Sequence, residues 1–248
     1  MDFSSIFSEA NWTIEGPDPA KPEHRKLIHQ VEGEIYRAYF KPATKNAGPI
    51  CANEYLTSKL AQHLGIPCAK VQLYKLVEGD TSKDGYISHW IDMSNPWSED
   101  VSKDRLEDTT AFSRLFCFDS WVHHLDRSAQ NLVYTGNAER YTVHLIDNES
   151  ALYGNSDNQP AYSVDNFDCG ESIRLPNAKS LVTRDELCGF ATTIQGLTDD
   201  DIVNIVNEFR AGAPDFLSEE HAEHIINKLK RRKELLLQQI CDWYDRQP

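Results

Sequence analysis

The hydrophobic pattern of the chain changes near residue 94, and this change restricts the fold more than any other feature. Before it, short apolar stretches with strand-like spacing surround one helical segment. After the segment Asn95-Pro96-Trp97, apolar residues recur mainly with helical spacing. The pattern predicts an α+β fold with two lobes, a small β-rich N-lobe with one helix and a larger, mainly helical C-lobe.

Turn and stop signals bound the elements of the first part. The expected elements are strands over 31–40, 70–77 and 85–92 and a helix over 50–64. Glu32-Gly33 reads as a hairpin turn, and Gly65 with Pro67 ends the helix. Residues 1–30 contain Pro17, Pro19 and Pro22 and are expected to be a weakly ordered extension. The N-lobe is therefore assigned to residues 31–93.

Helical spacing dominates residues 94–248, the expected C-lobe. Helices are predicted over 109–124, 183–195, 198–211 and 218–246. Thr198 followed by Asp201 is a capping pair for the third of these. Residues 156–177 are predicted to form a long irregular loop.

Charge and cysteine spacing limit the class of protein. The formal net charge of −14 argues against nucleic acid or an anionic membrane as a partner, because both require a basic surface. ATP stays compatible, since its site needs only local cations and a metal. No signal peptide and no apolar run of about 18 residues is present. The 6 cysteines lie far apart, which predicts reduced structural thiols and a cytoplasmic protein.

Asp126, Asn131 and Asp147 have the order of a phosphoryl-transfer site. The first two follow a predicted helix, and an apolar hairpin with a turn at Thr135-Gly136-Asn137 separates them from Asp147. In such a site one carboxylate accepts or orients the attacking hydroxyl, while an amide oxygen and a second carboxylate hold Mg²⁺ on the nucleotide phosphates. The alternative is that all three are ordinary turn-forming residues.

Lys41 and Glu54 are candidates for the phosphate-binding side of this site. Lys41 ends a predicted strand, where it would hold the α- and β-phosphates or would simply be exposed. Glu54 is its candidate partner. At about 100° per residue, Glu54 points away from the face formed by the helix leucines. It therefore either faces the sheet and pairs with Lys41 or is solvated.

Asp119 lies within the apolar face of the predicted helix 109–124. A carboxylate in that position needs hydrogen-bond partners or exposure to water. It therefore either braces the loop that carries Asp126 or lies at the rim of the apolar face.

A second chemistry is a hydrolytic metal site built from His123, His124, Asp126, His144, Asp147 and Glu149. It is disfavoured because adjacent helical histidines point about 100° apart. The chain has no nucleophile elbow, no P-loop and no G-x-G-x-x-G motif. If ATP binds, Gly33, Gly48 or other backbone amides must cover its phosphates.

Several segments resemble the HipA-like kinases. They are Asn53-Glu54-Tyr55-Leu56 with Leu64-Gly65-Ile66-Pro67, residues 118–132, and Leu145-Ile146-Asp147. The resemblance covers about residues 31–245. It implies a two-lobed protein-kinase-like fold, related to the phosphatidylinositol 3/4-kinases, with ATP in the cleft. It also implies roles for individual residues: Asp126 as catalytic base, Asn131 and Asp147 as Mg²⁺ ligands, Lys41 on the phosphates, and the backbone of His89, Trp90 and Ile91 as the adenine hinge.

The chain also differs from this family. Asp119 stands in the place of an Asn, His123 and His124 in the places of Gly and Asn, and Ser128 in the place of a His. None of these differences removes the base or a metal ligand. The leading interpretation is an ATP- and Mg²⁺-dependent kinase that acts on a protein Ser or Thr. The alternatives are a pseudokinase or nucleotide-binding regulatory module, and an adenylylating enzyme.

Overall fold

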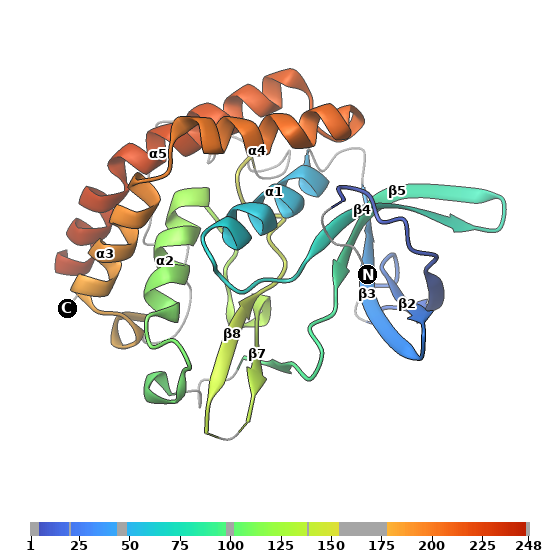
Figure 1. Cartoon of the computed structure of the whole chain (residues 1–248), viewed down its shortest axis with the longest axis horizontal. Helices are drawn as coiled ribbons and strands as arrows, with labels where there is room; N and C mark the ends of the chain where they lie inside the picture. The colour runs from blue at the N-terminus through green and yellow to red at the C-terminus, as the bar shows by residue number, and fades with distance from the viewer. Residues whose placement is uncertain are drawn as a thin grey trace.

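The N-terminal part of the chain forms a five-stranded antiparallel sheet in the order β1-β2-β3-β5-β4 (Figure 1). The computed structural model describes residues 5–19, 21–43, 49–97, 102–137, 139–153 and 178–246. The strands of this sheet are β1 (Thr13–Pro17), β2 (Arg25–Val31), β3 (Glu34–Pro42), β4 (Val71–Glu78) and β5 (Thr81–His89).

Strand β1 and all but the last residue of β2 lie within residues 1–30, so the prediction of weak order is wrong for these strands. Both are fixed by pairing with a partner strand: β2 pairs with β3 from Arg25 opposite Phe40 to Val31 opposite Glu34. Trp12 and Leu27 are buried in the small apolar cluster of this sheet. The turn at Glu32-Gly33 is as predicted, with φ of 51° and 87°, the left-handed values that a two-residue hairpin requires.

The β4–β5 turn is shorter than predicted. It consists of Gly79, with φ of 60°, and Asp80, and β5 already begins at Thr81. Residues 81–84 are exposed on both faces of this hairpin extension. They therefore lack the apolar alternation from which a strand is recognised.

Helix α1 (Ile50–His63) packs against β4 on one side and α4 on the other. This double contact buries nearly its whole circumference, including Leu56 and Leu60. The predicted stop is correct, because Gly65 takes a φ of 64°, a left-handed conformation that glycine adopts without strain.

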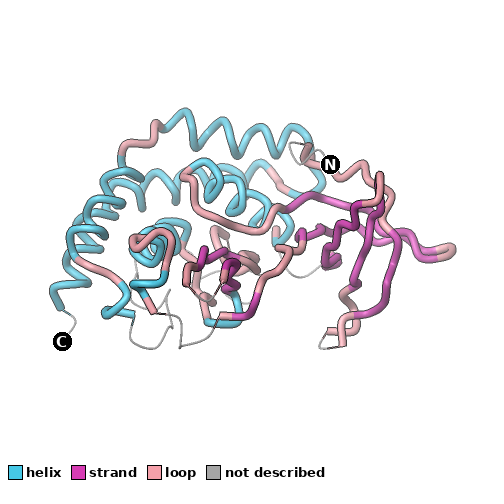
Figure 2. The backbone as a smooth tube through the Cα atoms, turned by 60° about the horizontal axis from the view of Figure 1, so that its bottom comes forward, coloured by secondary structure: helices cyan, strands magenta, loops and turns pink. Residues whose placement is uncertain are grey.

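The remaining helices gather at the opposite end of the molecule from the five-stranded sheet (Figure 2). They are α2 (Ala111–Val122), α3 (Arg184–Gln195), α4 (Asp199–Gly212) and α5 (Glu219–Arg246), with short 3₁₀ segments at Lys103–Arg105, Ala129–Asn131, Ala178–Leu181 and Pro214–Phe216. All four helices agree with the predicted spans. Thr198 and Asp201 form the predicted capping box, and Thr183 and Glu186 form another at α3. The predicted loop over 156–177 lies outside the described residues.

A second, three-stranded sheet carries the segment between Asn131 and Asp147. Its strands are β6 (Asn95–Pro96), β7 (Leu132–Gly136) and β8 (Tyr141–Leu145), in that order. The predicted hairpin is therefore present, and the segment expected to link the two parts contributes β6. Helix α2 lies beside this sheet and is enclosed by α3 and α5 in the main apolar core.

The cysteines differ from the prediction. Cys188 on α3 and Cys241 on α5 form a disulfide with a Cα–Cα distance of 6.3 Å, so the expectation of reduced thiols is wrong for this pair. Cys51, Cys68 and Cys117 are free, and Cys169 lies outside the described residues. The disulfide joins helices that are distant in sequence, which the spacing of cysteines could not reveal. Within the described ranges, we find no helix with the length and apolar character needed to span a membrane.

Candidate active site

A cavity of about 370 Å³ lies where the five-stranded sheet meets the β6–β8 sheet. Tyr39 and Lys41 of β3 line it from the five-stranded sheet, and Leu132 of β7 and Asp147, which follows β8, line it from the other part. The cavity also borders the chain that leaves β5 and the loop between β1 and β2. Several elements that are distant in sequence therefore surround one space.

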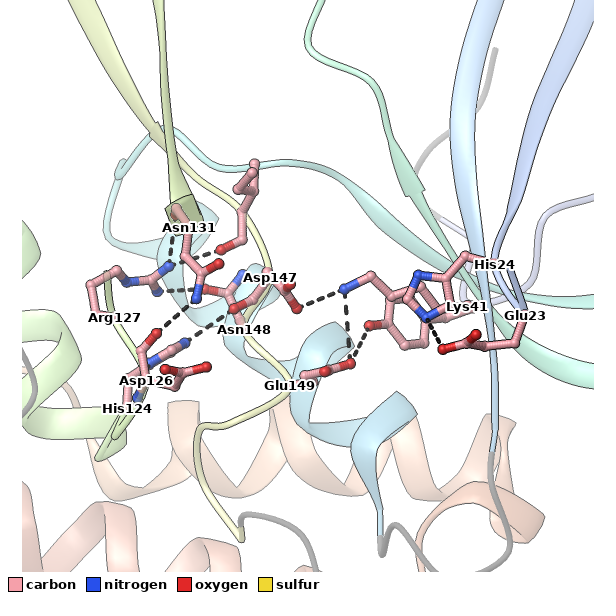
Figure 3. A network of polar contacts seen from close by, with 12 residues as sticks. Glu23, His24, Lys41, His124, Asp126, Arg127, Asn131, Asp147, Asn148 and Glu149 are labelled. Carbon is pink, nitrogen blue, oxygen red and sulfur yellow. Dashed lines mark hydrogen bonds and ion pairs between the residues drawn. The ribbon is translucent and has the colours of Figure 1, made fainter. Parts of the chain in front are cut away.

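Lys41 points from the end of β3 toward two carboxylates (Figure 3). Its Nζ lies 2.6 Å from Asp147 Oδ1 and 3.8 Å from Glu149 Oε2, and only 12% of the side chain is exposed. Burial by itself would lower the pKa of Lys41, but the carboxylates of Asp147, Glu54 and Glu149 raise it above its usual value. Lys41 is thus a buried, charged side chain, and the alternative of an exposed strand-end lysine is wrong.

Asp147 is held in an uncommon backbone conformation, with φ of 56°. A non-glycine residue pays about 1–2 kcal/mol for the left-handed region, and such residues concentrate at functional sites. Burial would raise the pKa of Asp147, yet the Lys41 cation holds it below its usual value. The carboxylate is therefore ionised and faces the cavity. Beside it, Tyr86 donates a hydrogen bond of 2.9 Å to Glu149.

Glu54 is completely buried on α1, so the solvated alternative is wrong. It faces the same site but does not form the expected ion pair with Lys41, which pairs with Asp147 instead. Among the described residues, neither oxygen of Glu54 has a hydrogen-bond partner of normal geometry. Burial raises the pKa of Glu54 to about 8, although Lys41 opposes the shift. Burial therefore favours the protonated form of Glu54, and Lys41 favours the ionised form.

Asp126 and Asn131 lie on the loop that follows α2 (Figure 3). The Asp126 side chain is exposed. Asn131 Nδ2 donates a hydrogen bond of 2.7 Å to the Asp126 carbonyl, which fixes the side chain and leaves the amide oxygen available as an acceptor. Asp126, Asn131 and Asp147 are thus brought to one side of the molecule, as the sequence predicts.

Arg127 is the residue that holds this loop together, and sequence analysis did not assign it a role. Its guanidinium is completely buried. Each of its N–H groups has an acceptor: the Asp119 carboxylate at 2.9 and 3.1 Å, the Asn131 carbonyl at 3.0 Å, the Ile146 carbonyl at 2.8 Å and Asn148 Oδ1 at 2.7 Å. Arg127 therefore connects the Asp126–Asn131 loop to the segment that carries Asp147.

Asp119 is completely buried and is the charged partner of Arg127. The interpretation that it braces the Asp126 loop is confirmed, and the alternative of an exposed rim position is wrong. Burial raises the pKa of Asp119, while the Arg127 cation acts in the opposite direction. The pair is bidentate, which is the strongest geometry for Arg and a carboxylate.

His124 connects the same two segments from another side. Its Nδ1 accepts the Asp126 backbone N–H at 3.2 Å, and its Nε2 lies 3.2 Å from the Asp147 carbonyl. The contact with a carbonyl requires a proton on Nε2, so the ring is neutral with Nε2–H donating. Burial, together with Arg127, holds the pKa of His124 well below its usual value. Of the supporting residues Asp119, Arg127 and His124, the sequence indicated this role only for Asp119, a carboxylate on an apolar helix face.

Helix α5 contributes two buried basic side chains that hold the segments on either side of the site. Arg232 Nε donates hydrogen bonds of 2.9 and 3.1 Å to the Ser120 and Trp121 carbonyls, at the end of α2. Lys228 Nζ donates to the Leu152 carbonyl at 2.7 Å. These contacts fix the chain before Asp126 and the chain after Asp147 to one helix.

His89 and Ile91, predicted to bind a cofactor, both line the cavity. The His89 and Trp90 amides are used by the Lys70 and Arg37 carbonyls, at 2.9 and 2.8 Å. In the described part of the chain, the Ile91 amide makes no such bond. Of these three amides, only that of Ile91 is not used in a backbone hydrogen bond among the described residues.

The alternative hydrolytic metal site is not assembled. His144 Nε2 lies 2.9 Å from the Thr135 hydroxyl, and both nitrogens of His124 contact the backbone. Across the ranges that the structure describes, no group of three His, Cys, Asp or Glu side chains is placed to hold a metal.

Comparisons with known proteins bear on the fold. No known family model and no curated protein matches this chain. The crystal structure of CtkA, a proinflammatory kinase of Helicobacter pylori, matches with a TM-score of 0.60 and 15% identity over 98% of both chains. HipA of Shewanella oneidensis, solved with HipB and operator DNA, matches with a TM-score of 0.43 and 12% identity over 98% of this chain and 70% of that one; this similarity is too low to support an argument. The chain therefore has a mixed α/β fold similar to that of a kinase.

Proposed function

We propose that this chain is an ATP- and Mg²⁺-dependent kinase that phosphorylates a Ser or Thr of a protein substrate. The observation that carries the proposal is that Lys41 and Asp147 line one cavity, while Asp126 and Asn131 lie on the neighbouring loop, which Arg127 connects to the segment of Asp147. The kinase-like fold supports it. In this proposal the five-stranded sheet with α1 is the N-lobe, the helical part is the C-lobe, and the nucleotide binds between them.

The cavity has an apolar end that suits the adenine and a charged end that suits the phosphates. Tyr39 and Trp90, whose ring centroids are 5.4 Å apart, line the apolar end together with Leu132. The adenine would bind here, with the Ile91 N–H as hydrogen-bond donor. The phosphates would then extend toward Lys41. A point charge on a flexible stem is suited to phosphate oxygens.

Asp147 and Asn131 fit Mg²⁺. An ionised carboxylate and a free amide oxygen are hard oxygen donors, and Mg²⁺ commonly takes only one or two protein carboxylates beside water and phosphate oxygens. When bound, the metal neutralises charge that develops on the phosphates. Lys41 pairs with the Asp147 carboxylate in the structure. This ion pair would have to open for Asp147 to hold Mg²⁺ and for Lys41 to contact the phosphates.

Asp126 accepts or orients the attacking hydroxyl. Its exposure makes it accessible to the side chain of another protein. Its backbone is fixed by His124 and Asn131, so the carboxylate is presented in one place. Arg127 and His124 act through this backbone as positioning residues.

The decisive experiment follows each phosphate of the nucleotide. The chain is incubated with Mg-ATP labelled at the γ position or at the α position, with and without a protein extract. We expect label on protein from γ-labelled ATP and none from α-labelled ATP. Transfer from the α position would indicate adenylylation. Binding of ATP without any transfer to protein would indicate a pseudokinase or regulatory module.

Asp147→Asn should abolish the dependence of nucleotide binding on Mg²⁺. The substitution keeps the shape of the side chain and removes the charge that faces the cation. Titration of ATP by calorimetry, with and without Mg²⁺, measures the effect.

Asp80→Asn, in the exposed β4–β5 turn, is the matched control and should keep the wild-type dependence on Mg²⁺. If Asp147→Asn also kept it, Asp147 would be a turn residue and not a metal ligand.

A further inference from the structure

Among the phosphate contacts expected from the sequence, Lys41 is the one that the structure places at the cavity. Gly33 lies in the β2–β3 turn, at the opposite end of β3 from Lys41, and Gly48 lies outside the described residues. The direction in which the Lys41 ammonium points therefore matters for any phosphate that binds here, and the side chains around it set that direction.

Asp147 has two roles in the proposed function that compete with each other. In the structure its Oδ1 accepts a hydrogen bond of 2.6 Å from Lys41 Nζ, whereas in the proposed function the same carboxylate binds Mg²⁺. Only 12% of the Lys41 side chain is exposed, and an unpaired charge in such a place is unfavourable. A second carboxylate that stays in position would keep the ammonium paired and oriented when the first is withdrawn.

Glu149 is held where such a second carboxylate is needed (Figure 3). Its Oε2 lies 3.8 Å from Lys41 Nζ. Tyr86, which is completely buried, donates a hydrogen bond of 2.9 Å to the same oxygen, and Lys41 Nζ lies 5.6 Å from the centre of the Tyr86 ring. Asn53 Nδ2 donates to the Glu149 carbonyl at 3.1 Å. Both the backbone and the side chain of Glu149 are therefore fixed beside Lys41.

Glu54, the partner expected from the sequence, is less suited to this role. Its carboxylate helps to raise the pKa of Lys41 through the buried interior, but no ion pair joins the two side chains in the part of the chain that the structure describes. Complete burial also disfavours the charged form of Glu54. Glu149 keeps 32% of its side chain exposed, so a charged carboxylate there costs less desolvation.

We infer that Glu149 is the positioning residue of Lys41 in the loaded site: it takes the Lys41 ammonium from Asp147 when Asp147 binds the metal, and Tyr86 holds it for this purpose. The ammonium then only shifts from one carboxylate to its neighbour and stays paired throughout. The counter-charge comes from the segment that carries the metal ligand and not from Glu54 on helix α1. The inference rests on the proposed function, because it concerns the site with Mg²⁺ and nucleotide bound, but it does not require transfer.

The test is a double-mutant cycle on the binding of a non-hydrolysable ATP analogue with Mg²⁺, measured by calorimetry. Glu149→Gln keeps the shape of the side chain and should weaken binding by roughly 3- to 10-fold, the range for charged contacts that stay partly in water. In Lys41→Met the same substitution should have no effect, because Glu149 acts through Lys41. Without Mg²⁺ the loss should be smaller, since Lys41 then keeps Asp147. Tyr86→Phe should show part of the Glu149→Gln loss, with the same dependence on Lys41.

Glu32→Gln, in the exposed β2–β3 turn, is the matched control and should bind the analogue like the wild type. An equal loss for Glu149→Gln with and without the Lys41 side chain would overturn the inference, as would unchanged binding. A loss coupled to Lys41 in Glu54→Gln and not in Glu149→Gln would also overturn it, because Glu54 would then be the partner. These outcomes leave the proposed function intact. Conversely, coupled binding in a protein that transfers no phosphate would support the role of Glu149 and remove the kinase.

Discussion

Asp126→Asn is expected to bind Mg-ATP within a few-fold of the wild type and yet to lose phosphoryl transfer by roughly 10²-fold or more. A carboxylate that accepts or orients the hydroxyl contributes mainly in the transition state, so its loss lowers turnover and not ground-state binding. The Asp126 side chain is exposed, and the contacts with His124 and Asn131 use its backbone. Folding should therefore be unaffected, which a thermal melt would confirm.

Lys41→Ala is the comparison variant that distinguishes a loss of ATP binding from a loss of the chemical step. A cation that binds phosphate acts in both the ground state and the transition state, so ATP binding and transfer should both weaken. If Asp126→Asn behaved like Lys41→Ala, Asp126 would contribute to binding and not to the chemical step. If it behaved like the wild type, Asp126 would be a loop residue.

Arg127→Met should destabilise the protein by about 3–5 kcal/mol, the range for removing one partner of a buried ion pair. The substitution leaves the Asp119 carboxylate buried without its counter-charge, and it also removes donors from the Asn131 and Ile146 carbonyls. Urea unfolding measures the change in the free energy of unfolding.

Two variants separate charge from packing in this experiment. Asp119→Asn/Arg127→Met should recover part of the loss, because no buried charge then stays unpaired. Arg184→Met breaks an ion pair with Asp245 that is about half exposed on both sides and should cost far less stability than Arg127→Met, because water screens an exposed pair. Equal costs for Arg127→Met and Arg184→Met would show that the buried pair contributes no more than a surface pair.

The helices could be predicted from the sequence because their signals are local. Apolar residues recur every three or four positions, and the capping pair Thr198 and Asp201 lies within one turn. The strands were harder to predict from the sequence. Strand β1 carries little apolar alternation of its own and is defined by its pairing with β2, while the first residues of β5 are exposed on a hairpin. In both cases the stabilising partner lies elsewhere in the chain, and a local pattern cannot report it.

In the candidate site too, local order along the chain could be predicted, and contacts between distant segments could not. Asp126, Asn131 and Asp147 have a recognisable order, so their proximity could be predicted, and their roles stay predictions. The contacts of Arg127 with Asp119 and Asn148 join residues from three segments, and no spacing reveals which acceptors a buried guanidinium will find. Likewise, the Lys41–Asp147 ion pair could not be chosen over Lys41–Glu54 without the positions of both carboxylates.

The position of Arg232 and Lys228 on the last helix has a consequence for how the protein is made. A ribosome adds about 5–20 residues per second, so roughly 4 to 17 s separate the synthesis of Asp147 from that of Arg232. During this interval the end of α2 and the Leu152 carbonyl have not yet met the side chains that hold them. The nascent chain can therefore form the contacts of Arg127 and His124 around its candidate catalytic carboxylates first, and the contacts that tie both neighbouring segments to one helix form only when α5 has been translated.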